Sequence, residues 1–200
     1  NNVNLKKVTS IRDLGLILDS ELSYKDHYEY ITQKSFKALG FLLRISKPFR
    51  DPYSIITLYY ALVRSLLEYQ SFIWSPYYTS HKDKIERVQK YFTRILSYRA
   101  GHGRRLDYEE RLSLLKMDKL SVRRNVAELM YLHKLVHGCL DTSDLELLSF
   151  QANSRLRSGE IFRLKKYNTN VGHFCPIGRL MRSYNNISKV SPNVDIFFDS

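Results

Sequence analysis

Helical spacing of apolar side chains is the strongest structural signal in the chain. Between residues 28 and 47 these side chains recur at intervals of three, four and seven, at Ile31, Ala38, Leu39, Leu42 and Ile45. Pro48 ends this predicted helix, and Asp51 is placed to cap a second one that begins at Pro52. The second helix runs toward Trp74 and is apolar on nearly all sides, so we expect it to lie centrally.

The same reasoning predicts further helices along the chain. The third spans residues 80–97, with an inner face of Ile85, Val88, Phe92, Ile95 and Leu96. Two more are predicted over 108–115 and 121–136, the latter closed by Gly138, and a short one within 141–150. Beyond residue 151 the pattern indicates only a strand around 161–164 and a short helical piece near 179–184.

One stretch near the start of the chain has a different period. Residues 11–24, IRDLGLILDSELSY, alternate apolar and polar residues, which predicts a half-buried strand. Leu14, Leu16 and Leu18 would face one side, and Gly15 the other, where a strand glycine often marks a bulge or a close backbone approach. The predicted fold class is therefore mainly α: a helical bundle with a short N-terminal β element.

Charge favours an anionic partner. The 200 residues carry 32 Lys and Arg against 20 Asp and Glu, a net charge of +12. Residues 101–150 hold eight basic and eight acidic side chains, so the excess lies on the first three predicted helices and in the tail. Cys139 and Cys175 form no CxxC motif, which suits a reducing, intracellular environment, and no apolar run is long enough to predict a membrane partner.

Two groups of basic residues are candidates for nucleic-acid binding. Spacings of three and four place the first group along the third predicted helix, at Lys84, Arg87, Lys90 and Arg94. The second lies in the tail beside Phe162 and Tyr167, at Arg155, Arg157, Arg163, Lys165 and Lys166. Basic side chains can follow a phosphate backbone while aromatic rings stack on unpaired bases. The alternative for both groups is an ordinary solvated surface.

Catalytic motifs are missing from the sequence. It contains no Asp-Asp pair, HExxH, GxSxG or phosphate-binding glycine loop, so we predict no catalytic residue, metal site or cofactor in this chain. His133 and His137, four residues apart with Cys139 beyond them, are the best metal candidate, but an interfacial pair is a simpler account. We expect core positions for the aromatic residues Trp74, Tyr59, Tyr60 and Tyr69.

Several segments resemble a known family. They are DLGLILDSELSYKDHYEYITQKSFKALGFLLR, DPYSIITLYYALVRSLLEYQSFIWSPYY and HKDKIERVQKYFTRIL, in this order. This part of the chain is similar to the region after the catalytic palm in reverse transcriptases of jockey-type non-LTR retrotransposons. The similarity is close over residues 5–99. It is looser over the later RLSLLKMDKLSVRRNVAELMYLHKLVHG and FRLKKYNTNVGHFCPIGRLMRSYN.

The resemblance implies a division into four parts. Residues 1–26 would end the palm, 27–100 form thumb-like helices, 101–150 a helical C-terminal extension and 151–200 a basic tail. Asp13, Leu14 and Gly15 would belong to a strand like the primer grip. Because the catalytic Asp-Asp strand of the family lies upstream, Asp13 and Asp19 should not inherit its metal-binding role, and magnesium is expected only in the missing palm.

The resemblance therefore predicts a fragment: the thumb and C-terminal region of an RNA-directed DNA polymerase, inactive alone. Its partners would be an RNA template, a DNA primer, their heteroduplex, and the upstream palm and fingers, in an intracellular setting both nuclear and cytoplasmic. Two alternatives remain open. One is a non-catalytic helical nucleic-acid-binding module derived from such an element, and the other is a structural helical adaptor whose basic faces are only solvated.

Overall fold

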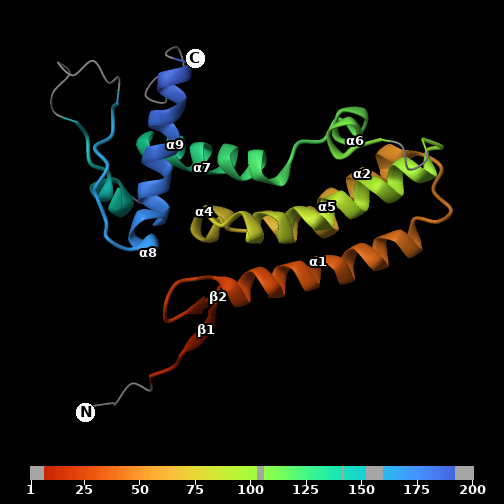
Figure 1. Ribbon diagram of the computed structural model, residues 1–200, viewed down its shortest axis with the longest axis horizontal. Helices are drawn as coiled ribbons and strands as arrows, with labels where there is room; N and C mark the ends of the chain where they lie inside the picture. Colours follow the sequence, from red (N-terminus) through yellow and green to blue (C-terminus); the bar gives the residue numbers. More distant parts are fainter. Residues whose placement is uncertain (1–6, 103–105, 141, 152–159, 192–200) are drawn as a thin grey trace. The chain divides into compact units, whose positions relative to one another are not determined.

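The computed structural model describes residues 7–102, 106–140, 142–151 and 160–191 (Figure 1). It confirms a mainly helical chain with a short N-terminal β element, which is a two-strand antiparallel hairpin. Arg155 and Arg157 lie outside the described residues. Among the helices that are described, none is long and apolar enough to cross a membrane.

The chain divides into two compact units. The N-terminal unit comprises Asn1–Tyr69 and Pro76–Leu120, and the C-terminal unit comprises Gln70–Ser75 and Ser121–Ser200. The four-part division implied by the resemblance stays a prediction. Each unit is built around its own set of buried side chains.

The N-terminal hairpin pairs β1 (Ser10–Asp13) with β2 (Leu16–Asp19), so that Asp13 lies opposite Leu16. Leu14 and Gly15, with φ of 44° and 89°, form a two-residue turn of the kind that matches strand twist. The prediction of one continuous strand with Leu14, Leu16 and Leu18 on one face was therefore wrong. Period-two alternation continues across a two-residue turn, so the pattern alone does not separate a hairpin from a longer strand.

The carboxylate of Asp19 organises the loop from β2 to α1 (Lys25–Ile45). It accepts hydrogen bonds from the backbone N–H groups of Glu21, Ser23 and Tyr24, at 3.0, 3.0 and 2.8 Å, and from the Ser23 hydroxyl at 3.1 Å. Partial burial alone would raise the pKa of Asp19, but these hydrogen bonds together lower it. The same loop holds Leu22 and Tyr24 in left-handed backbone conformations, with φ of 51° and 55°.

The predicted second helix is interrupted. Asp51 caps α2 (Pro52–Tyr59) as expected, accepting from the N–H groups of Tyr53 and Ser54. The helix then widens into one π-helical turn, η1 (Tyr60–Arg64), continues as α3 (Ser65–Glu68), and breaks where Gln70 has φ of 50°. A segment that is apolar on all sides has no hydrophobic face whose period could reveal such a break.

Helices α1 and α5 (Thr79–Arg99) lie side by side and parallel in the N-terminal unit (Figure 1). Near their starts, Lys84 Nζ of α5 lies 2.7 Å from Glu29 Oε1 of α1. Near their ends, the Arg99 guanidinium donates to the Ser46 hydroxyl at 3.0 Å and the Leu43 carbonyl at 2.9 Å. The apolar core of this unit includes Leu39, Leu42, Val63, Ile85, Val88 and Phe92. Ile45, expected on the inner face, is exposed.

A buried polar network joins α5 to α6 (Tyr108–Leu115), which begins with a capping box of Asp107 and Glu110. Glu86 accepts a short hydrogen bond from the Tyr108 hydroxyl and another, at 3.1 Å, from the Leu120 N–H. Gln89 donates to Tyr108 and to the Asp118 carbonyl. Burial, and then the Glu86 carboxylate, raise the pKa of Tyr108. Glu86 is thus a structural residue within the core.

The C-terminal unit contains α4 (Ser71–Trp74), α7 (Leu120–Val136) from Ser121 onward, η2 (Thr142–Leu147), α8 (Asn170–His173) and α9 (Pro176–Val190). Its core is formed by Leu132, Leu135, Leu148, Phe162, Met181 and Tyr184. Around the predicted strand at 161–164, the described structure has one isolated bridge, between Phe150 and Phe162. The Asn185 side chain of α9 fixes this segment by bonding both the N–H and the carbonyl of Phe162, at 3.1 and 2.8 Å.

Arg179 is the main polar link within the C-terminal unit. Its Nε lies 2.9 Å from Glu128 Oε1 of α7, a carboxylate that is almost completely buried. The same guanidinium donates to the carbonyls of Phe174 and of Phe72 in α4. Removing one member of such a buried pair leaves the other charge without compensation, which makes this link costly to break.

We expect Asp19→Ala to lower the free energy of unfolding by about 2 kcal/mol, because several donors in the loop lose a charged acceptor. Asp13→Ala is the matched control, since Asp13 is an exposed acid of the same hairpin and should change stability by roughly 0.5 kcal/mol or less. Urea unfolding of both variants measures the difference. Equal, small changes would show that the Asp19 hydrogen bonds do not organise the loop.

His27 should make the protein sensitive to mild acid. Its ring is buried, its Nδ1 accepts from the Ile17 N–H at 3.4 Å, and burial lowers its pKa from 6.5 to about 4. In the unfolded chain His27 binds a proton below about pH 6.5, whereas in the folded chain it stays neutral until about pH 4. The free energy of unfolding should therefore fall as the pH drops, by about 2 kcal/mol between pH 7 and 5.

The measurement is urea unfolding of the protein and of His27→Gln across this pH range. The variant should have a flatter pH dependence than the parent. His81, whose pKa is lowered chiefly by burial, contributes with the same sign, so His81→Gln is measured beside it. Asp19 loses its contribution only as the pH falls below about 4, outside this window. An unchanged slope in His27→Gln would contradict the assignment.

Candidate nucleic-acid interface

Three of the four basic residues predicted on the third helix share one exposed surface, which we call the α5 stripe: Arg87, Lys90 and Arg94. Lys90 Nζ lies 5.4 Å from the ring centroid of Tyr108 in α6, and the Arg94 guanidinium lies 5.2 Å from that of Tyr91. Among the described residues, no carboxylate forms an ion pair with these three side chains. Their charge is therefore available to an external anion.

Lys84 differs from the rest of this predicted group. Its ammonium forms a hydrogen-bonded ion pair with Glu29 of α1 at 2.7 Å, and its side chain is only 36% exposed. The hydrogen bond and charge of Lys84 lower the pKa of Glu29. Lys84 thus connects two helices, and its positive charge is largely compensated by Glu29 at the surface.

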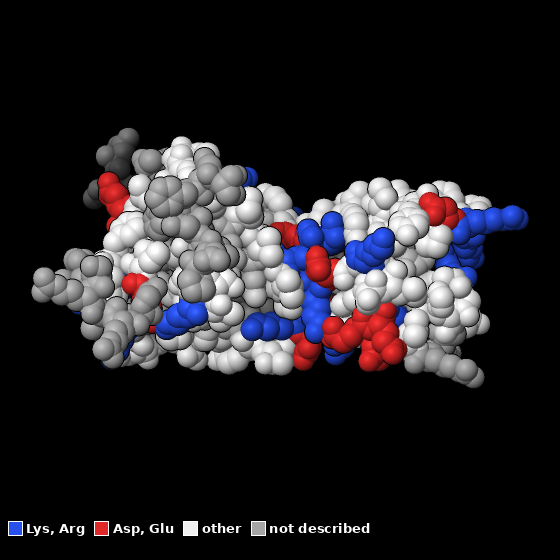
Figure 2. Space-filling model, turned by 90° about the horizontal axis from the view of Figure 1, so that it is seen from above, with Lys and Arg blue, Asp and Glu red and all other residues white. Residues whose placement is uncertain are grey.

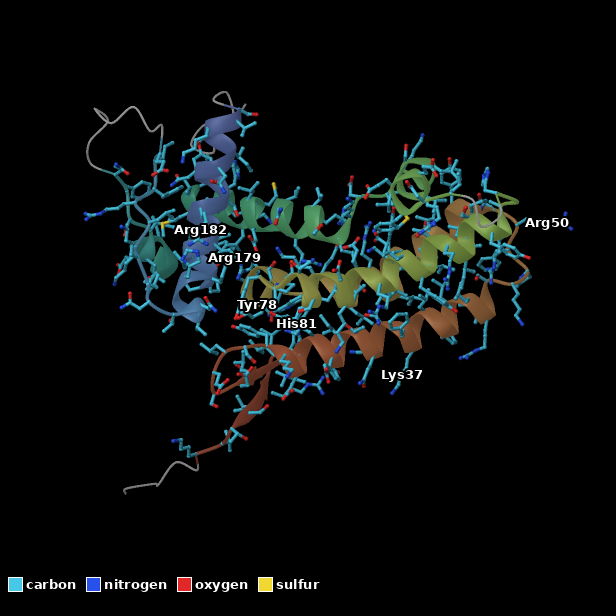
Figure 3. All side chains as sticks on the ribbon, viewed as in Figure 1. Lys37, Arg50, Tyr78, His81, Arg179 and Arg182 are labelled. Carbon is cyan, nitrogen blue, oxygen red and sulfur yellow. The ribbon has the colours of Figure 1, made fainter. Side chains whose placement is uncertain are left out.

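A second basic surface was missed by the sequence analysis. We call it the α1 row, and it consists of Tyr30, Lys34, Lys37, Phe41 and Arg44. Figure 3 shows Lys37 on the side of α1 that faces away from α5. Residues 30–50 contain five basic residues and no acidic ones, a signal that the sequence already carried.

Aromatic rings accompany the charges of the α1 row. Lys34 Nζ lies 5.8 Å from the ring centroid of Tyr30. The Arg12 guanidinium of β1 lies over the same ring at 4.9 Å and donates to the Tyr30 hydroxyl at 2.9 Å. Phe41 is 50% exposed on the same helix. The row therefore combines cations with exposed aromatic surface, the pairing that suits a nucleic-acid strand.

The three residues predicted to resemble a primer grip, Asp13, Leu14 and Gly15, lie together at the exposed tip of the hairpin. Tyr69 covers one side of the tip, because its hydroxyl donates to the Leu14 carbonyl at 3.2 Å. A Cβ on Gly15 would lie 3.5 Å from the Tyr69 ring, but the φ of 89° is what favours glycine here. Tyr69 is 54% exposed, so its predicted core position was wrong.

The basic residues of the tail lie in the C-terminal unit. Arg163, Lys165 and Lys166 are exposed and follow the buried, Asn185-bound Phe162. The Arg163 N–H also bonds the Ser149 carbonyl at 2.7 Å, and Lys165 Nζ lies 5.8 Å from the Tyr167 ring centroid. Arg163, Lys165 and Lys166 therefore form a separate basic surface, on a segment that is held by backbone hydrogen bonds at Phe162 and Arg163.

Net charge alone does not define these surfaces. Figure 2 shows acidic side chains beside basic ones on the face it presents. The described structure also contains compensated pairs, such as Lys119 with Glu109, whose charged atoms lie 2.5 Å apart. The α5 stripe and the α1 row are candidates because their cations are exposed and lack ion pairs with carboxylates among the residues the structure describes.

The remaining candidates are the histidine pair and the predicted core aromatic residues. The rings of His133 and His137 lie 4.2 Å apart, centroid to centroid, and the described residues contain no group of three or more His, Cys, Asp or Glu arranged to hold a metal ion. Trp74 and Tyr59 are fully buried, as expected of core aromatics, and Tyr60 is partly buried.

Comparison with known proteins finds no matching family model, no matching curated protein and no matching solved structure. The functional argument therefore depends on the residues themselves.

Leu14 provides a test of the hairpin tip. A left-handed backbone costs a leucine roughly 1 kcal/mol, and asparagine adopts this conformation more readily. We expect Leu14→Asn to raise the free energy of unfolding by about 0.5–1 kcal/mol. Ile11→Asn, at an exposed position in β1, should lower it because asparagine is a poor strand former. Thermal unfolding distinguishes the two, and a loss of stability in Leu14→Asn would contradict the turn assignment.

Proposed function

We propose that this chain is the thumb and C-terminal region of an RNA-directed DNA polymerase of the non-LTR retrotransposon kind. In this role it grips the heteroduplex of RNA template and DNA primer while chemistry occurs elsewhere in the polypeptide. The observation that carries the proposal is the α5 stripe with the α1 row: exposed cations, interleaved with aromatic rings, on two parallel helices.

The geometry of the α5 stripe suits a phosphate backbone. From Arg87 to Arg94 the helix rises about 10 Å, and a duplex carries a charge roughly every 1.7 Å along its axis. Three exposed cations over this length can therefore reach several phosphates. Contacts of this kind fix orientation without reading sequence, which suits a polymerase that must accept every template.

The exposed surface of the hairpin is consistent with a second partner, the upstream palm and fingers. Every residue of β1 is exposed, and Ile11 and Leu14 present apolar side chains at 55% and 75% exposure. An exposed strand edge with apolar side chains is a favourable surface for another part of a sheet. We propose that the palm covers it, with the hairpin tip close to the primer end.

The acidic residues of the hairpin support a role without chemistry. Phosphoryl transfer to a primer needs paired carboxylates that hold metal ions. The Asp19 carboxylate is engaged by four donors of its own loop, and Asp13 lies exposed on the other strand. In this proposal the catalytic carboxylates and their magnesium belong to the palm.

Salt-dependent binding tests the proposal. We expect the triple variant Arg87→Gln, Lys90→Gln, Arg94→Gln to weaken binding of an RNA·DNA heteroduplex whatever its sequence. If each cation neutralises one phosphate, the slope of log K against log salt should flatten by about two to three units. Fluorescence anisotropy on two heteroduplexes of unrelated sequence, at several salt concentrations, measures both quantities.

Matched variants distinguish binding by the α5 stripe from a general effect of the net charge. Lys84→Gln should change the slope less than any single stripe substitution, because Glu29 already compensates Lys84. The control triple Lys82→Gln, Lys116→Gln, Lys134→Gln removes the same charge from exposed positions outside the stripe. If the control flattens the slope as much, or the stripe variant leaves it unchanged, the helices serve a structural adaptor role and the proposal fails.

A further inference from the structure

A pocket of about 400 Å³ lies in the N-terminal unit, where α1 and α5 end and α2 begins. Its lining combines basic Lys47, Arg50 and Arg99 with apolar Phe49, Ile55 and Leu96. The volume is within the range of about 300–1,000 Å³ that is typical of small-molecule sites. The mixture of cations and apolar surface restricts what could occupy it.

The cationic side is partly preorganised. Arg99 Nη1 donates to the Ser46 hydroxyl and Nη2 to the Leu43 carbonyl, at 3.0 and 2.9 Å, so the guanidinium is held in place by neutral acceptors. Lys47 and Arg50 are exposed, and Figure 3 shows Arg50 projecting from this end of the unit. In the described part of the chain, none of the three forms an ion pair with a carboxylate.

The neighbouring acid, Asp51, does not cancel this charge. Its carboxylate accepts from the N–H groups of Tyr53 and Ser54 and, at 2.7 Å, from the Ser54 hydroxyl. The Ser54 and Tyr53 hydrogen bonds lower the pKa of Asp51, which stays ionised. Because Asp51 already occupies the first N–H groups of α2, an anion in this pocket would be bound by the side-chain cations and not by the helix end.

The apolar side has a buried floor and an exposed rim. Ile55 and Leu96 are each 2% exposed, whereas Phe49 is 43% exposed and presents part of its ring to the solvent. A ligand here would combine an anionic group with a flat apolar one. A phosphate-bearing nucleotide with an unpaired base has both.

We propose that this pocket is a nucleotide site, separate from the α5 stripe and the α1 row. The phosphate lies among Lys47, Arg50 and Arg99, and the base lies against Phe49. The ligand is a single unpaired nucleotide, such as one at the end of a strand. The site requires only the pocket and its charges, so it does not depend on heteroduplex binding.

Titration of the full chain with adenosine 5′-monophosphate tests the site. Isothermal calorimetry should detect binding of the monophosphate. Adenosine, which lacks the phosphate, and ribose 5-phosphate, which lacks the base, should each bind with an affinity lower by about tenfold or more. Ribose 5-phosphate binding as tightly as the monophosphate would overturn the role of the base. Adenosine binding as tightly would overturn the role of the cations.

Substitutions locate the site. Arg50→Gln and Phe49→Ala should each lower the affinity for the monophosphate by on the order of tenfold. The far-UV spectra and thermal midpoints of these variants show whether folding is intact. Lys82→Gln and Tyr98→Ala are controls, because they remove a cation and an aromatic ring from exposed positions that do not line the pocket. Equal losses in the controls, or no loss in folded pocket variants, would overturn the proposal.

Heteroduplex binding distinguishes the failure of this site from the failure of the proposed function. Blunt heteroduplex contains no unpaired nucleotide, so Arg50→Gln should change its affinity less than the α5-stripe triple variant. No monophosphate binding in a chain that binds heteroduplex overturns the pocket alone. Monophosphate binding in a chain that ignores heteroduplex supports the pocket and overturns the thumb assignment.

Discussion

The parallel pairing of α1 with α5 is the constraint on which the N-terminal unit depends. The pocket at the helix ends exists because these helices lie side by side in one register, and the same pairing holds the two candidate surfaces in one unit. An exposed pair such as Lys84 with Glu29 contributes roughly 0–1 kcal/mol, so buried residues such as Leu42 and Phe92 supply most of the stabilisation. Arg99, which binds the last carbonyls of α1, adds directional bonds that fix the register.

Sequence periodicity predicted the helices that have one apolar face, including α1, α5 and α6. It failed where the feature that ends or interrupts an element leaves no periodic trace in the sequence. The Leu14–Gly15 turn preserves strand alternation, and the π-helical turn at 60–64 lies in a segment without a polar face. The partner of Lys84 also lies 55 residues away, so only tertiary structure reveals that its charge is compensated.

Several charged residues proved structural, while one surface went unnoticed. Asp19 closes the loop before α1, and Glu86 accepts two hydrogen bonds from neighbouring elements. Neither role could be read from the sequence, because a carboxylate in a motif looks the same whether it binds a ligand or a backbone. The α1 row required only a search for a long acid-free segment. The structure then showed that its cations are exposed, unlike Lys84, which is paired with a carboxylate.

The hairpin tip combines two features that both reduce stability. Leu14 adopts a left-handed backbone that disfavours leucine, and it exposes three quarters of an apolar side chain to water. Within the described chain, Tyr69 contacts the tip through the Leu14 carbonyl, and the Leu14 side chain remains 75% exposed. An apolar side chain fits a protein surface better than a phosphate. In the proposed function, the tip would therefore contact the palm, and the basic surfaces on α1 and α5 would hold the nucleic acid.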